Sequence, residues 1–125
     1  MTRILLVEDN ELNRSLVRAI ISRTAEPRLQ NADLVEVQTV GEARAALAGS
    51  DPFDVILLDV HLPDGSGLDI ARELADHPVR PAVVALTAAA MAREQTAAMD
   101  AGCDTFLAKP YTSTDLIQTV IDVLK

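Results

Sequence analysis

One stretch decides the fold: VILLDVHLPDGSG, residues 55–67. Its four consecutive aliphatic residues do not alternate with polar ones, which predicts a strand buried on both faces, as in the centre of a parallel sheet. Asp59 follows at the carboxyl end of this strand, where open α/β sheets bind their ligands. The proline and glycines after it indicate a loop. Asp59 could instead cap the next helix, but Ser66 and Asp69 lie closer to that helix, so Asp59 is the first candidate for a functional residue.

Length and composition indicate one globular domain. A chain of 125 residues is long enough to bury a core without disulfides or structural metals. Apolar residues make up 49% of the chain and aromatic residues only 2%, so the core must be aliphatic. The formal net charge of −8 argues against the phosphate backbone of nucleic acids, and against anionic membranes, as direct partners.

Cysteine content and hydropathy favour a cytoplasmic location. Cys103 is the single cysteine of the chain and has no partner for an internal disulfide, which fits a reducing compartment and a packing role. No apolar run approaches the roughly 20 residues of a membrane span. The N-terminal aliphatic run is too short for a signal peptide.

Three further apolar runs also end in polar residues. We predict each to be a strand of the same sheet, whereas residues 34–40 alternate apolar with polar side chains, which is typical of an edge strand. The runs, each with its polar end, are residues 4–7 before Glu8 and Asp9, residues 82–87 with Thr87, and residues 105–108 before Lys109.

Helical periodicity fills the segments between these strands. In the first helix Leu12, Leu16 and Ile20, with Val17 and Ile21, are spaced along one face, and Thr112 with Asp115 predicts a capping box before the last helix. The predicted helices cover residues 10–23, 41–48, a segment carrying Leu68, Ala71 and Leu74, residues 91–101, and the segment from Thr112 to Leu124.

Five strands alternating with five helices predict an α/β fold. Parallel strands joined by right-handed crossovers give a doubly wound five-stranded sheet with helices on both faces, of the flavodoxin-like kind with strand order 2-1-3-4-5. The switch point of that order lies between the first and third strands, which brings the polar strand ends together. They are Glu8, Asp9, Asp59, Thr87 and Lys109.

These residue types favour phosphoryl transfer at a magnesium site. Three neighbouring carboxylates repel one another unless a cation neutralises them, and oxygen ligands suit Mg²⁺. A metal, the Lys109 ammonium and the Thr87 hydroxyl could stabilise a transferring phosphoryl group. Asp59 is then the candidate nucleophile.

The chain resembles the receiver domains of two-component response regulators over almost its whole length. The resemblance implies a signalling switch rather than an enzyme, formed by a single receiver domain over residues 1–125 with no output domain. It rests on the residues Val7-Glu8-Asp9-Asn10, on Asp59 followed by Pro63 and Gly67, on Thr87-Ala88 and on Lys109-Pro110.

The resemblance also implies a role for each site residue. Asp59 would accept a phosphoryl group from a histidine kinase or a histidine phosphotransfer protein, and Thr87 and Lys109 would bind that group. Phe106 would change position with Thr87, or else be ordinary core packing. The implied Mg²⁺ ligands are Asp9, Asp59, the backbone carbonyl of His61 and, largely through water, Glu8.

The resemblance further implies an output surface. A downstream protein would read the state of the domain on the face formed by the fourth helix, the fifth strand and the fifth helix, and a homodimer is left open. The segment from Ala25 to Asp33 is longer than this family usually carries, and it is either a docking loop or, the favoured interpretation, a solvated connection. His61 is a less usual residue at a position that affects the lifetime of the phosphoryl group in this family, or else it is exposed to solvent without consequence.

Three other functions are weaker. A flavodoxin-like flavin carrier would need hydroxyls and glycines after the first strand, where Glu8 and Asp9 would repel a phosphate. An aspartyl phosphatase would carry its nucleophile on the first strand and a general acid two residues later, a pattern that Asn10 and Glu11 do not supply. A receiver-like adaptor that is never phosphorylated is disfavoured by the complete set of site residues.

Overall fold

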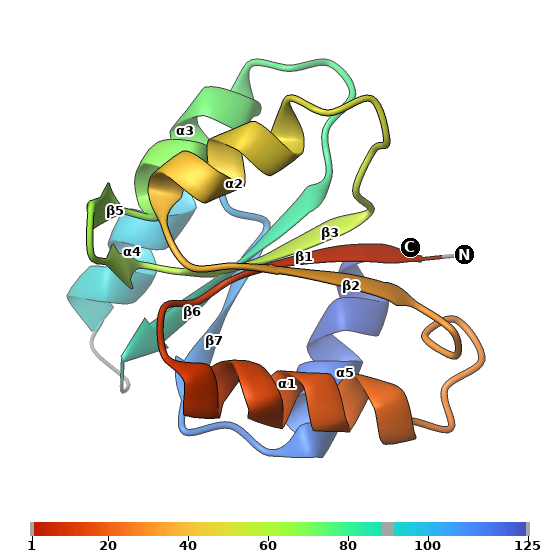
Figure 1. Ribbon diagram of the computed structural model, residues 1–125. Coiled ribbons are helices and arrows are strands. Elements are labelled where there is room, and N and C mark those ends of the chain that lie inside the picture. The colour runs from red at the N-terminus through yellow and green to blue at the C-terminus, as the bar shows by residue number, and fades with distance from the viewer. Residues whose placement is uncertain (1, 89–91, 125) are drawn as a thin grey trace.

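A computed structural model of the chain describes residues 2–88 and 92–124, and it contains the predicted five-stranded parallel sheet (Figure 1). The strand order is β2-β1-β3-β6-β7, which is the predicted order 2-1-3-4-5 once two short strands outside this sheet are set aside. The strands are β1 Arg3–Val7, β2 Asp33–Val37, β3 Val55–Asp59, β6 Ala82–Ala88 and β7 Thr105–Lys109.

Helices cover both faces of the sheet. In Figure 1, α1 and α5 lie below the sheet, and α2, α3 and α4 lie on the other side. The predicted doubly wound α/β architecture is therefore confirmed. The helices are α1 Glu11–Arg23, α2 Val40–Leu47, α3 Leu68–Ala75, α4 Ala92–Asp100 and α5 Ser113–Val123.

The central strands contribute to two separate cores. Ile56 and Leu58 of β3 pack with residues of α2, α3 and α4, whereas Val55 and Leu57 pack with residues of α1 and α5. Successive side chains of a strand point to opposite faces of the sheet, and both faces are covered here. This is why the apolar runs show no alternation with polar residues.

Two short strands, His61–Leu62 (β4) and Gly65–Ser66 (β5), form a hairpin where a plain loop was predicted. Between them, Asp64 accepts hydrogen bonds from the backbone N–H groups of Val40 and Gly41 in the first turn of α2, over 2.8 and 3.0 Å. The segment after β3 is thereby tied to a neighbouring helix.

The predicted strand over residues 34–40 is wrong at its end. The edge position is confirmed, but β2 ends at Val37 and Val40 begins α2. Thr39 is the N-cap of that helix, and its side chain accepts a hydrogen bond from the N–H of Glu42. Because this cap ends the extended conformation, the helix starts one residue before the predicted Gly41.

The apolar stripe predicted for the first helix is only partly buried. Val17 and Ile21 are in the core, but Leu12 is 76% exposed and Leu16 is 48% exposed. The buried face of α1 instead includes Arg14, whose guanidinium is satisfied by polar partners. The inward face is therefore rotated away from the first two leucines.

The long segment before β2 is not simply a solvated connection. Leu29 is fully buried and packs with Val17 and Ile21 of α1. Asp33, the predicted end of this segment, belongs to β2. The interpretation of this segment as a solvated connection is therefore wrong at Leu29, whose side chain packs in the core.

The predicted end signal of the fourth helix and the predicted start signal of the fifth helix are both confirmed. Gly102 follows α4 with a φ of 100°, a left-handed conformation that suits glycine after a helix. Thr112 and Asp115 form the predicted capping box. Met91, the predicted first residue of the fourth helix, lies outside the described residues.

Among the described residues, no helix is long and apolar enough to cross a membrane.

Candidate functional site

The strand register places the polar strand ends along one rim of the sheet. Val7 of β1 is level with Leu58 of β3, and Asp59 is level with Leu86 of β6. Thr87 is level with Ala108 on β7, immediately before Lys109. The polar residues at the ends of β1, β3, β6 and β7 therefore meet at the carboxyl edge of the sheet, as the sequence predicted.

Three charged side chains form the centre of this rim. Lys109 Nζ donates a hydrogen bond to Glu8 Oε1 over 2.8 Å and lies 3.5 Å from Asp59 Oδ2. Glu8 and Asp59 are buried, with 1% and 8% of their surface exposed. One ammonium therefore faces two carboxylates in a largely desolvated setting.

The two carboxylates shift each other's acidity in opposite directions. Burial raises the pKa of Asp59, and the hydrogen bond and negative charge of Glu8 raise it further, to about 7, against the opposing effect of Lys109. Burial would also raise the pKa of Glu8, but the hydrogen bonds of Asp59 and Lys109 outweigh it and lower that pKa. Without a metal, Asp59 is the group that takes up a proton first.

The donor set fits a hard divalent cation. Glu8, Asp9 and Asp59 each offer a carboxylate oxygen, and these oxygens lie within 4.8 Å of one another. Glu8 Oε2 is buried and has no hydrogen-bond partner among the described residues, while Asp9 is exposed. A buried carboxylate oxygen without a partner is costly, and a bound cation or its water would satisfy it.

A family model identifies the domain: the response regulator receiver domain matches residues 4–121. The chain belongs to this family of receiver domains. Receiver domains are signalling domains of two-component systems, and they accept phosphoryl groups from histidine kinases.

Two curated relatives contain segments similar to this receiver domain. The aerobic respiration control sensor protein ArcB of Escherichia coli is 39% identical over 112 residues, which are 87% of this chain and 13% of ArcB. The response regulator protein PmrA of Pseudomonas aeruginosa is 38% identical over 114 residues, which are 91% of this chain and 48% of PmrA. The chain thus spans half or less of each relative.

A solved receiver domain with a similar fold contains a metal ion. It belongs to a sensor histidine kinase of Pseudomonas aeruginosa and has a magnesium ion coordinated in its active site cleft. Its TM-score to this receiver domain is 0.79 at 28% identity, and the match covers 98% of this chain and 97% of that one.

The remaining predicted residues of the receiver domain surround the centre. Thr87 is fully buried, and its Oγ1 has no hydrogen-bond partner among the described residues. Phe106 on β7 is half-buried and packs against the core that contains α4. The backbone N–H of His61 donates to Asp59 Oδ1 over 3.2 Å, while its exposed ring contacts Glu94 of α4 over 2.9 Å.

Gly67 leaves room for the backbone of the candidate acceptor. A Cβ atom at this position would lie 2.0 Å from the carbonyl oxygen of Asp59, a distance that no side chain tolerates. The N–H of Gly67 also donates to the carbonyl of Val60 over 2.8 Å. This close approach fixes the turn that follows Asp59.

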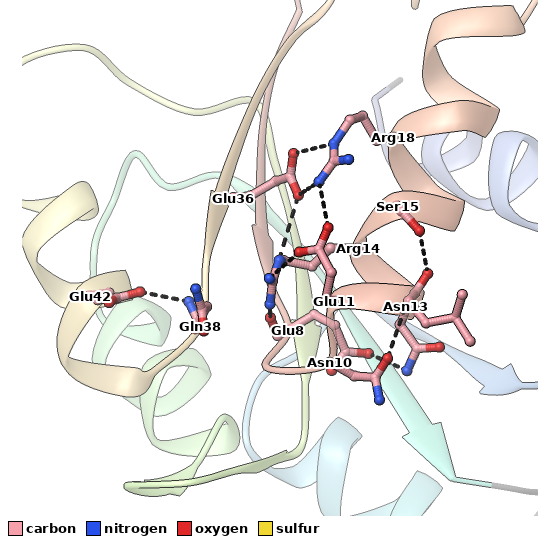
Figure 2. Close-up of polar contacts among 11 residues, drawn as sticks. Glu8, Asn10, Glu11, Asn13, Arg14, Ser15, Arg18, Glu36, Gln38 and Glu42 are labelled. Carbon is pink, nitrogen blue, oxygen red and sulfur yellow. Dashed lines mark hydrogen bonds and ion pairs between the residues drawn. The ribbon is translucent and has the colours of Figure 1, made fainter.

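Two residues of α1 that were not predicted as site residues reach back to the site. Asn13 Nδ2 donates to Glu8 Oε1 over 3.0 Å, and Arg14 Nη1 donates to the backbone carbonyl of Glu8 over 3.0 Å. Figure 2 shows Arg14 held in turn by Glu11 and Glu36. Arg14 lies on the buried face of α1, whereas the helical pattern predicted Leu12 and Leu16 on that face. No signal in the sequence pattern distinguishes Arg14.

Proposed function

We propose that this receiver domain is a phosphorylation-dependent signalling switch whose phosphoryl acceptor is Asp59. The observation that carries the proposal is the position of Asp59 at the end of the central strand, with Lys109 Nζ 3.5 Å from Oδ2 and two further carboxylates nearby. A carboxylate at the rim of the sheet, largely buried and with a cation beside it, can attack an electrophile that arrives from solvent.

The transfer forms one bond and breaks another. A carboxylate oxygen of Asp59 attacks the phosphorus of a phosphohistidine, the phosphorus–nitrogen bond breaks, and its electron pair remains on the imidazole of the donor. The product is an acyl phosphate on Asp59. Lys109 is placed to neutralise charge on the phosphoryl oxygens, and the Thr87 hydroxyl is the candidate hydrogen-bond donor to one of them.

Mg²⁺ is the proposed cofactor. Asp9, Asp59 and the backbone carbonyl of His61 would hold it directly, and Glu8 largely through water. When bound, the ion supplies positive charge that stabilises the phosphoryl oxygens. Two observations support this assignment: the grouped carboxylates, and Glu8 Oε2, which has no partner in the described part of the chain.

The proposed readout is a change in the binding surface. The Thr87 hydroxyl on β6 has no hydrogen-bond partner among the described residues, and Phe106 lies on the neighbouring strand, beside α4. Movement of the hydroxyl toward a phosphoryl group would give the Phe106 ring space to adopt a second position. A downstream protein would then bind the surface of α4, β7 and α5.

The partners follow from this role. The phosphoryl donor is a histidine kinase or a histidine phosphotransfer protein in a phosphorelay, and the domain assists its own phosphorylation and slow dephosphorylation without acting as an enzyme on other molecules. The relatives support such a partner, since a sensor protein and a response regulator both contain similar segments.

Intact mass spectrometry tests the proposal. Incubation with acetyl phosphate and Mg²⁺ should add one phosphoryl group to the native domain and none to Asp59→Asn. An adaptor that is never phosphorylated would show no addition in either protein, and equal addition to both would place the acceptor elsewhere.

A further inference from the structure

We propose that Asn13 is a positioning residue of the site, which holds Glu8 so that its second carboxylate oxygen faces the magnesium site. The inference rests on the proposed function for the identity of the metal, but it concerns a residue of α1 that none of the predicted site motifs includes.

The hydrogen bonds of Glu8 carry the inference. Only 2% of the Glu8 side chain is exposed, and its Oε1 accepts from both Asn13 Nδ2, over 3.0 Å, and Lys109 Nζ, over 2.8 Å. While Asp59 is ionised and cannot donate, Oε2 of Glu8 accepts from no described residue. One oxygen is therefore fixed by two donors, and the other is left for a ligand in the site.

Helix capping does not explain the Asn13 side chain. Its backbone N–H already donates to the N-cap residue Asn10, over 3.0 Å. At the same position in α5, the side chain of Asp115 returns to its own N-cap and completes a capping box. In α1 the corresponding side chain instead reaches out of the helix to Glu8, so it serves the site.

Two donors on one oxygen have separate consequences. Lys109 lies close to Asp59 as well as Glu8, so a phosphoryl group on Asp59 would compete with Glu8 for its ammonium. The amide of Asn13 is neutral and is fixed on α1, so it has no comparable attraction to the phosphoryl group. Asn13 therefore keeps Glu8 in place while Lys109 is released to the phosphoryl group.

Calorimetric titration with Mg²⁺ in the absence of any phosphoryl donor measures this role. Loss of a residue that orients a metal-binding group lowers metal affinity by a factor of about ten or more, so Asn13→Ala should bind Mg²⁺ about tenfold more weakly than the native domain. Alanine is favourable in helices, so the variant should fold. Ser15→Ala is the matched control, because Ser15 lies on the same helix and, among the described residues, its hydroxyl donates only to the carbonyl of Leu12.

A double-mutant cycle separates positioning from a general structural effect. If Asn13 acts through Glu8, Asn13→Ala should have almost no additional effect on Mg²⁺ affinity in a Glu8→Gln background. Equal losses in both backgrounds, or native affinity in Asn13→Ala, would overturn the inference. A native domain that does not bind Mg²⁺ would contradict the proposed function instead, so the two failures are distinguishable.

Discussion

Lys109 Nζ donates a hydrogen bond to Glu8 Oε1 over 2.8 Å, and this contact joins residues that are 101 positions apart in the sequence. The contact places a fixed positive charge beside the carboxylates that would hold a metal ion. Lys109 therefore both neutralises the acidic cluster and competes with any cation that binds there.

Replacement of Lys109 should have opposite effects on metal binding and on phosphorylation. In Lys109→Met the competing charge is lost, so Mg²⁺ affinity should rise by about three- to tenfold. Phosphoryl uptake from acetyl phosphate should fall by about a hundredfold, because a charged donor to the phosphoryl group is gone. Titration and rate measurements on one preparation check both; a parallel fall in affinity and rate would contradict this account of Lys109.

Stability in metal-free buffer should depend on the charge of Asp59. Its folded pKa of about 7 lies above the reference value of 3.8, so the folded state retains a proton that the unfolded state loses. Stability contributed by this proton is present at low pH and is lost as the pH rises from about 4 to 7. Asp59→Asn, which cannot ionise, should be about 1–3 kcal/mol more stable than the native domain at pH 8, and the difference should shrink at pH 5.

Denaturant unfolding with EDTA at both pH values provides the measurement. Asp69→Asn is the control, because the side chain of Asp69 is 49% exposed and pairs with Arg72 on α3. Its substitution should change stability by less than about 0.5 kcal/mol at either pH. The electrostatic account fails if Asp59→Asn gives no more stability at pH 8 than at pH 5.

Two glycine substitutions should differ sharply. Gly67→Ala would place a methyl group 2.0 Å from the carbonyl oxygen of Asp59, whereas the nearest atom to a Cβ at Gly41 is Asp64 Oδ2 at 3.6 Å. We expect Gly67→Ala to lose about 2 kcal/mol or more and Gly41→Ala to lose almost nothing. Thermal unfolding compares the two variants. Equal stability would show that the turn after Asp59 can accommodate a methyl group at position 67 at little cost.

A beryllium fluoride mimic of the acyl phosphate should act mainly on the proposed output surface. Its addition should shift the amide NMR signals of α4, β7 and α5 more than those between Arg18 and Val40, because the switch is attributed to Thr87 and Phe106. Thr87→Ala should blunt the response. If the mimic binds while the segment from Ala25 to Asp33 moves instead, the output surface has been assigned to the wrong face.

Much of the fold could be predicted because its signals are local. Apolar runs such as residues 55–58 need no partner to be recognised, and their order along the chain, with one alternating strand, is enough to give the sheet topology. The strand-end positions of Asp59 and Lys109 follow from the same runs. Their grouping at one edge is a consequence of parallel strands rather than of any motif.

The errors arose where tertiary contacts override local pattern. Leu12 and Leu16 have helical spacing, but the sheet contacts a different face of α1, on which Arg14 is buried with polar partners. Val40 was predicted to end a strand, but its backbone N–H donates a hydrogen bond to Asp64, which lies in the hairpin after β3. Asn13 could not be identified because its role depends on the position of Glu8 across the loop.

Peptide mapping after borohydride reduction tests the central claim most directly. The domain is phosphorylated with acetyl phosphate and Mg²⁺, reduced so that an acyl phosphate becomes the corresponding alcohol, and digested for mass spectrometry. The account predicts that the reduced residue is Asp59 and that EDTA or Asp59→Asn abolishes it. Reduction at Glu8 or Asp9, or an unmodified chain under conditions in which Mg²⁺ binds, would contradict the assignment of Asp59 as the phosphoryl acceptor.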